Sequence, residues 1–163
     1  MTIERFQHTQ EIENQTPMRA LWVDDRGVTS ENAQSMIKGS NADLTVVTSI
    51  EEFSSEWQNG DYNVLIFDHQ IGYGVHGSTL WKDIVEQGEK RPLIAAVITS
   101  KILEKEKQAY TWLAGTPNLF FSKENANYEG IGAELRKTFE DVAAAEGISA
   151  PQLAYLAELT ANT

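Results

Sequence analysis

Four of the five short apolar runs in this chain are followed by side chains that could bind a cation or a phosphoryl group. Two aspartates follow the first run, one follows the third, a threonine follows the fourth and a lysine the fifth: Asp24, Asp25, Asp68, Thr99 and Lys123. Clustered carboxylates repel one another unless a cation lies between them. Because oxygen ligands without His or Cys favour a hard ion, the three aspartates would select Mg²⁺ or Mn²⁺ before Zn²⁺.

The other groups in this set suit phosphoryl transfer. A lysine ammonium and a threonine hydroxyl can both stabilise the equatorial oxygens of a phosphoryl group during in-line displacement. A carboxylate can itself be the nucleophile, and Asp68, alone after the middle run, is the candidate. Each residue taken alone would more simply be a turn residue, a helix cap or a solvated strand end. The joint pattern at four run ends favours one site.

The runs that must position these residues are short and almost continuously apolar. Such runs, without apolar–polar alternation, are typical of strands buried on both faces of a parallel sheet. In open sheets of this kind, ligands bind just beyond the carboxyl ends of the strands, so the five residues should converge there. The expected strands are Ala20–Val23, Leu44–Thr48, Tyr62–Phe67, Leu93–Ile98 and Asn118–Phe121.

Amphipathic stretches between and after these runs predict helices. The expected helices run from a Ser30 cap to about Lys38, from Ser49 to about Asn59, from Ser78 to about Gln87, from Ile102 to Leu113 and from Gly130 to about Ala145. Ser49 with Glu52 three residues later is the capping-box pattern. Strict β–α alternation indicates an α/β fold with a parallel sheet, right-handed crossovers and helices on both faces.

Length and composition limit the classes of protein to consider. The 163 residues suffice for one compact domain and are too few for two. The formal net charge of -11 disfavours nucleic acid and anionic membrane surfaces as partners. No run approaches the roughly 20 apolar residues of a membrane-spanning helix. The chain has no Cys, which excludes thiolate sites and fits a reducing compartment, so we expect a cytoplasmic protein.

The two ends of the chain differ from its middle. We expect a loose polar arm at 1–17, the domain itself at 18–146 and a C-terminal helical extension at 147–163. The extension would hold one helix from about Pro151 to Leu159, because a Pro soon after a Ser is a common helix opening. This helix either packs back on the domain or serves as a partner-binding or dimerising helix, an alternative that includes a homodimer.

Four sequence pieces together resemble the receiver domain of two-component response regulators, the CheY-like superfamily. They are Leu21-Trp-Val-Asp-Asp25, Val64-Leu-Ile-Phe-Asp68, Ala96-Val-Ile-Thr-Ser100 and Phe120-Phe-Ser-Lys123. The resemblance covers about Ala20 to Glu140, in the family's order and near its spacing. It implies a five-stranded parallel sheet of flavodoxin-like order 2-1-3-4-5 with helices on both faces. The C-terminal helix would be an addition to that fold.

The resemblance also implies roles for the acidic residues. Asp68 would be the phosphoacceptor and, with Asp25, a direct Mg²⁺ ligand. Asp24 would act on the ion mostly through water. The backbone carbonyl of Gln70, two residues after the acceptor, would be a further ligand.

Three further residues would act on the phosphoryl group or report its presence. Lys123 would pair with the phosphoryl group, and the Thr99 hydroxyl would move toward that group. Phe120 stands where the family places an aromatic that turns inward as the hydroxyl moves. Together Thr99 and Phe120 would form a two-state switch driven by a local change of charge.

This chain departs from the family pattern on two loops. Where the family usually has Asp-x-x-Met-Pro, this chain has Asp68-His-Gln-Ile-Gly72, and Gly77 comes one residue late. Glu124 follows the lysine where a proline, often cis, is usual. Two histidines, His69 and His76, flank the acceptor loop and are expected to be exposed to solvent.

The implied function is that of a single-domain receiver. It would accept phosphate from a histidine kinase or a phosphotransfer protein and signal to a downstream protein through a changed surface. Its only catalysis would be Mg²⁺-dependent self-phosphorylation from a donor and slow autodephosphorylation. The first alternative is a pseudo-receiver, an interaction module that is not phosphorylated.

Two enzymatic alternatives fit the residues less well. An Asp-based Mg²⁺ phosphatase would place Asp-x-Asp on the first strand, whereas Asp24 and Asp25 are adjacent. A hydrolase triad of Ser78, His76 and Asp68 would lack the Gly-x-Ser-x-Gly turn that exposes such a nucleophile.

Overall fold

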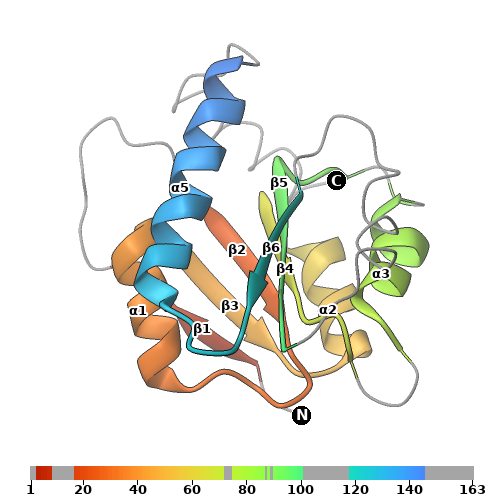
Figure 1. Cartoon of the computed structure of the whole chain (residues 1–163). Helices are drawn as coiled ribbons and strands as arrows, with labels where there is room; N and C mark the ends of the chain where they lie inside the picture. Colours follow the sequence, from red (N-terminus) through yellow and green to blue (C-terminus); the bar gives the residue numbers. More distant parts are fainter. Residues whose placement is uncertain are drawn as a thin grey trace.

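A six-stranded sheet organises the part of the chain that the computed structural model describes, namely residues 3–8, 17–71, 75–86, 88, 90–100 and 118–145. The strand order is β1-β3-β2-β4-β5-β6 (Figure 1). All neighbouring strands are parallel except β1, which is antiparallel to β3. The strands are β1 Glu4–Phe6, β2 Arg19–Val23, β3 Asp43–Val47, β4 Val64–Phe67, β5 Ile94–Thr99 and β6 Asn118–Ser122. Counted without β1, the order is 2-1-3-4-5, which confirms the predicted fold class.

Helices cover both faces of this sheet (Figure 1). Helices α1 and α5 lie on one face, and α2 and α3 lie on the other. A short π-helix, η1, continues α3 without a break. The bounds are α1 Ser30–Ser40, α2 Ile50–Asn59, α3 Gly77–Leu80, η1 Trp81–Glu86 and α5 Tyr128–Ala145.

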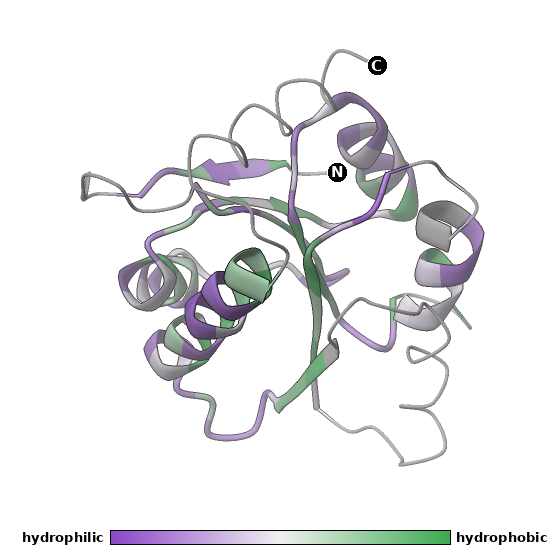
Figure 2. Ribbon diagram, turned by 90° about the horizontal axis from the view of Figure 1, so that it is seen from above, coloured by the Kyte–Doolittle hydropathy of each residue, from purple (hydrophilic) through white to green (hydrophobic). Residues whose placement is uncertain are grey.

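Each face of the sheet has its own buried core, because successive strand side chains point to opposite sides. The α1/α5 core includes Trp22, Met36 and Phe139. The α2/α3 core includes Phe53 and Phe67. Figure 2 shows the apolar strands in the middle of the molecule, with polar helix surfaces outside them. Burial on both faces explains why the strands read as continuous apolar runs in the sequence.

Two helix starts show how local sequence sets element bounds. The Ser49 hydroxyl accepts a hydrogen bond from the Glu52 backbone N–H at 3.1 Å, so Ser49 caps α2 as predicted, and Glu52 Oε1 reaches back to the Ser49 hydroxyl at 3.1 Å. For α1 the predicted cap was one residue too late. Thr29 has extended backbone angles, and its hydroxyl accepts from the Asn32 N–H at 3.1 Å. Ser30 is already the first helical residue.

The predicted loose arm at 1–17 requires a correction, because β1 lies within it. Its three residues pair with β3 from Glu4↔Val46 to Phe6↔Leu44. Arg5 forms an ion pair with Glu56. Three mostly polar residues are too short a pattern to predict a strand, and their pairing partner lies about forty residues away along the chain.

Other expected elements differ in bounds or lie outside the described residues. The third helix begins at Gly77 and becomes π-helical at Trp81, where a uniform helix was expected. The expected helices at Ile102–Leu113 and Pro151–Leu159, with the extension at 147–163, lie outside the described residues. None of the helices described has both the length and the apolar character needed to cross a membrane.

Candidate functional site

Backbone hydrogen bonds between neighbouring strands place the predicted site residues at one edge of the sheet. The Asp24 N–H donates to Val47 O and the Asp68 N–H to Val23 O, each at 3.0 Å. The Lys123 N–H donates to Thr99 O at 2.9 Å. The parallel ladder thus extends beyond the ends of the strands, and it fixes the backbone from which each charged side chain projects.

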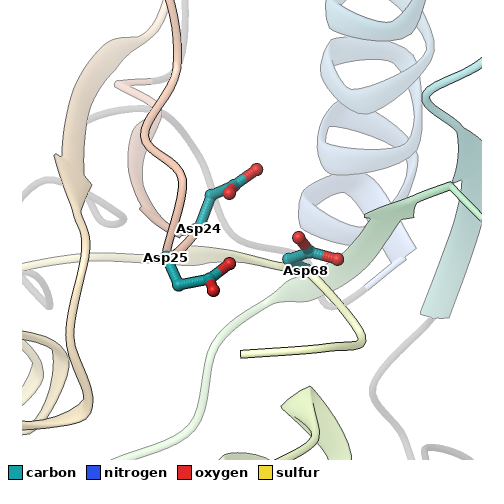
Figure 3. Close-up of side chains that lie close together, drawn as sticks. All are labelled: Asp24, Asp25 and Asp68. Carbon is teal, nitrogen blue, oxygen red and sulfur yellow. The ribbon is translucent and has the colours of Figure 1, made fainter. Parts of the chain in front are cut away.

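Three carboxylates meet at this edge (Figure 3). One oxygen from each of Asp24, Asp25 and Asp68 lies within 4.8 Å of the other two. Asp24 and Asp68 are buried, with 2% and 6% exposure, whereas Asp25 is exposed. An all-oxygen set with one solvent-facing member suits a hard cation that keeps part of its water shell, such as Mg²⁺.

Lys123 bridges the two buried carboxylates. Its Nζ donates to Asp24 Oδ2 at 2.6 Å and to Asp68 Oδ2 at 2.8 Å. The structure therefore brings Lys123 into the site although Glu124 replaces the usual proline. Its ammonium supplies the positive charge that two buried carboxylates need.

Burial and pairing change the ionisation of both partners. Burial raises the pKa of Asp24 above its ordinary value, against the opposing effect of the Lys123 ammonium, and the nearby Asp68 carboxylate adds to the rise. For Lys123, burial by itself lowers the pKa. The hydrogen bonds and charges of Asp24 and Asp68 together outweigh burial, so the pKa of Lys123 is raised. The ammonium is thus held firmly protonated between its partners.

The second oxygen of each buried carboxylate accepts from the backbone. Asp24 Oδ1 accepts from the Arg26 N–H at 3.0 Å, in a turn that Gly27 completes with a φ of 77°. Asp68 Oδ1 lies 3.4 Å from the donating N–H of Gln70. Gln70 is exposed, and ligation by its carbonyl stays a prediction.

The side chains of the two predicted switch residues are directed toward the α2/α3 side of the sheet. Val97 belongs to the α2/α3 core and Ile98 to the α1/α5 core, so alternation directs the Thr99 side chain toward the α2/α3 side. Thr99 is buried, and Phe120 is half-buried against the α2/α3 core. The structure gathers the three aspartates and Lys123 at one point, whereas Phe120 packs against the α2/α3 core.

The loop after Asp68 is closed by its own hydrogen bonds. The Gly77 N–H donates to His69 O at 2.8 Å, and the Ile71 N–H donates to Val75 O at 2.7 Å. The two histidine rings are in contact, with centroids 4.6 Å apart and planes tilted by 42°. The expectation that both histidines are exposed is wrong, because His69 is 2% exposed and His76 is half-buried.

One residue near the site was not found from the sequence. Tyr128, the first residue of α5, packs against Trp22 with ring centroids 5.8 Å apart. Burial raises the pKa of its phenol, the Lys123 ammonium lowers it, and the carboxylates of Asp24 and Asp68 raise it further. The only available signal was its position five residues after the lysine, at the start of a helix.

Comparisons with known proteins agree on the fold. No family model matches this sequence, and no curated protein matches it. A CheY-like receiver domain protein from Methanospirillum hungatei is similar in structure, with 14% identity, a TM-score of 0.61 and coverage of 80% of this chain and 99% of the other. The BeF3-activated receiver domain of DrrB has 14% identity, a TM-score of 0.56 and coverage of 77% and 99%.

A receiver domain protein from Bacillus halodurans has 22% identity, a TM-score of 0.52 and coverage of 78% and 97%. At these levels of identity the likeness concerns the backbone arrangement. The chain has the fold of response regulator receiver domains, over most of its length and nearly the whole of theirs.

Proposed function

We propose that this protein is a phosphoreceiver, which takes a phosphoryl group on Asp68 from a histidine kinase or a phosphotransfer protein. The observation that carries the proposal is the Lys123 ammonium, bonded to both Asp24 and Asp68 beside a third carboxylate. This arrangement lies at the carboxyl edge of a sheet with the receiver fold. The changed surface that follows phosphorylation would bind a downstream protein.

Each side chain has a defined task in this reaction. A carboxylate oxygen of Asp68 forms a bond to phosphorus as the bond between phosphorus and the donor atom breaks, and the dephosphorylated donor leaves with that electron pair. Lys123 offsets negative charge on the phosphoryl oxygens, and the Thr99 hydroxyl donates a hydrogen bond to one of them. Mg²⁺, held by Asp24, Asp25, Asp68 and the Gln70 carbonyl, would neutralise further charge when bound.

Phosphorylation would be communicated through Thr99 and Phe120. Movement of the buried Thr99 hydroxyl toward the phosphoryl group would leave space on the α2/α3 side of the sheet. The half-buried Phe120 ring, two residues along β6 from the partner of Thr99, can turn into that space. The exposed surface of the domain would change without a change of fold.

The pseudo-receiver is the second candidate, and one observation favours it. Lys123 itself supplies a positive charge to one oxygen of each buried carboxylate, so the fold does not depend on a metal ion for that charge. An Asp68→Ala variant with full activity in the cell would support this candidate.

The proposed function is tested by phosphorylation with acetyl phosphate, followed by intact-protein mass spectrometry. Wild-type protein should gain one phosphoryl group in millimolar Mg²⁺ and none in EDTA. Asp68→Asn should gain none. The matched control is Asp61→Asn, because Asp61 pairs with Arg19 away from the site. Equal labelling of Asp68→Asn and wild type would contradict the proposal, as would wild-type protein that responds to neither acetyl phosphate nor beryllofluoride.

A further inference from the structure

The Lys123 ammonium would compete with a bound cation for two of the same carboxylates, those of Asp24 and Asp68. It has three N–H donors, and two of them bond to Asp24 and Asp68. Two positive charges on the same carboxylates repel each other, so cation binding requires the ammonium to withdraw at least partly from Asp24. The Lys123 backbone is held by Thr99 O, and the withdrawal must therefore be a local movement of the side chain.

Tyr128 lies next to this cluster of charged side chains. Its ring packs on Trp22, which is fully buried and stands two residues before Asp24 on the same face of β2. The phenol responds electrostatically to the same three charged groups that form the site, Lys123, Asp24 and Asp68. The Trp22 indole N–H has no hydrogen-bond partner among the described residues, so the Trp22 ring is held in place by packing alone.

The start of α5 is a fixed platform for this tyrosine. A Cβ on Gly39 of α1 would lie 1.9 Å from Glu129 O, and one on Gly132 would lie 2.4 Å from Met36 O. The backbones of α1 and α5 are therefore in direct contact. Asn127 caps the helix, because its Oδ1 accepts from the Gly130 N–H at 3.1 Å. The backbone that carries Tyr128 is therefore held in place, and a movement of the Lys123 side chain need not shift it.

We propose that Tyr128 is a positioning residue for Lys123. Its hydroxyl accepts an N–H from the ammonium as the ammonium leaves Asp24, and it thereby sets how readily the acidic site takes a divalent cation. The inference rests on the metal site of the proposed function. A neutral hydroxyl suits this task because it can accept from the ammonium without adding charge to the site.

The test compares Tyr128→Phe with wild type in the full chain, by calorimetric titration with MgCl₂ and no phosphodonor. Tyr128→Phe keeps the ring on Trp22 and removes only the hydroxyl. One hydrogen bond of about 1 kcal/mol corresponds to about fivefold weaker Mg²⁺ binding. The melting temperature without Mg²⁺ should stay close to that of wild type, and so should the final extent of phosphoryl loading at saturating Mg²⁺.

The matched control is Tyr62→Phe. Tyr62 is also half-buried, and its hydroxyl donates to Glu56 Oε2 at 2.6 Å, away from the acidic site. Its loss should leave Mg²⁺ affinity unchanged. Wild-type Mg²⁺ affinity in Tyr128→Phe, or an equal loss in Tyr62→Phe, would overturn the role of Tyr128.

The outcomes separate this inference from the proposed function. Wild-type protein that binds Mg²⁺ but takes no phosphoryl group would contradict the phosphoreceiver alone, and the effect of Tyr128→Phe on Mg²⁺ affinity would stand. Wild-type protein that binds no Mg²⁺ would contradict both. Normal phosphorylation with an unchanged Mg²⁺ affinity in Tyr128→Phe would contradict the inference alone.

Discussion

The two faces of the sheet are held by different kinds of contact. On the α1/α5 face, helix backbones touch at Gly39 and Gly132, where a single methyl group could not be added without a clash. On the α2/α3 face, the contacts are between aromatic side chains: Phe67 lies 5.5 Å from Phe53 and 6.0 Å from Trp81, between ring centroids. Backbone contact leaves no room for adjustment, whereas side chains can repack.

This difference corresponds to the two parts of the site. Asp24, Asp68 and Lys123 each stand two residues after a strand residue that packs in the α1/α5 core, and this face must hold them in a fixed geometry. Thr99 and Phe120 face the α2/α3 side, where the helix also becomes π-helical at Trp81. π-Helical turns are rare and are frequently found at functional sites. We infer that one face positions the chemistry and the other accommodates the response.

The largest predicted effect is that of Gly39→Ala, on the rigid face. The new methyl group must separate α1 from α5, because its nearest neighbour is the backbone oxygen of Glu129. We expect a loss of about 3 kcal/mol or more in the free energy of unfolding, measured in urea. Gly130→Ala is the control, with a change within about 1 kcal/mol, because its methyl would meet only the Asn127 side chain.

Phe67→Leu probes the adaptable face and should lower the free energy of unfolding by less than Gly39→Ala does. The ring is fully buried, and its loss removes contacts with Phe53 and Trp81. Partial repacking should limit the loss to about 2 kcal/mol in the same urea assay. A larger loss than that of Gly39→Ala would break the proposed contrast between the faces.

Smaller effects are expected at the cations that cap a helix on each face. Arg136 donates to Ser40 O at 2.7 Å and to Asn41 O at 3.0 Å, at the end of α1. Lys90 donates to the carbonyls of Trp57, Gln58 and Gly60 at the end of α2.

Arg136→Met should cost about 2 kcal/mol and Lys90→Met about 1 kcal/mol, since unsatisfied helix-end carbonyls are costly and the arginine is more deeply buried. Thermal or urea unfolding of the two variants decides the order. A greater loss in Lys90→Met would reverse the assignment of the rigid face.

The smallest effect concerns Asp24 and depends on pH. Because burial raises the folded-state pKa of Asp24 above 3.8, its ionised form is less favourable in the folded than in the unfolded chain. This contribution to stability is present at acid pH and is lost as the pH rises through the folded-state pKa. Without metal, the free energy of unfolding of Asp24→Asn should therefore rise relative to that of wild type over that window, by up to about 1 kcal/mol. The lost hydrogen bond to Lys123 reduces this gain.

Calorimetric melting of both proteins at a series of pH values measures this difference. Saturating Mg²⁺ should remove the advantage of Asp24→Asn, because the variant loses a ligand group. If the stability advantage of Asp24→Asn over wild type fell as the pH rises, the predicted direction of the pH dependence would be contradicted.

Much of this architecture could be predicted from the sequence, because its signals are local. Doubly buried strands read as apolar runs. The rule that ligands bind at the carboxyl ends of such strands points directly to Asp24, Asp25, Asp68 and Lys123. The Ser49 capping box needs only four consecutive residues.

The features that were missed depend on contacts between distant parts of the chain. Strand β1 forms only because the edge of β3 accepts it. Nothing local shows that Gly39 and Gly132 bring two helices into backbone contact, or that Arg136 and Lys90 reach the ends of other helices. The burial of His69 likewise depends on a loop closed by its own hydrogen bonds.

The most direct test of the central claim is to locate the phosphoryl group in the wild-type chain. After treatment with acetyl phosphate and Mg²⁺, borohydride reduces a phosphoaspartate to homoserine, and peptide mass spectrometry identifies the converted residue. The account predicts homoserine at position 68, in amounts that depend on Mg²⁺. Conversion at another aspartate, or at none, would contradict it.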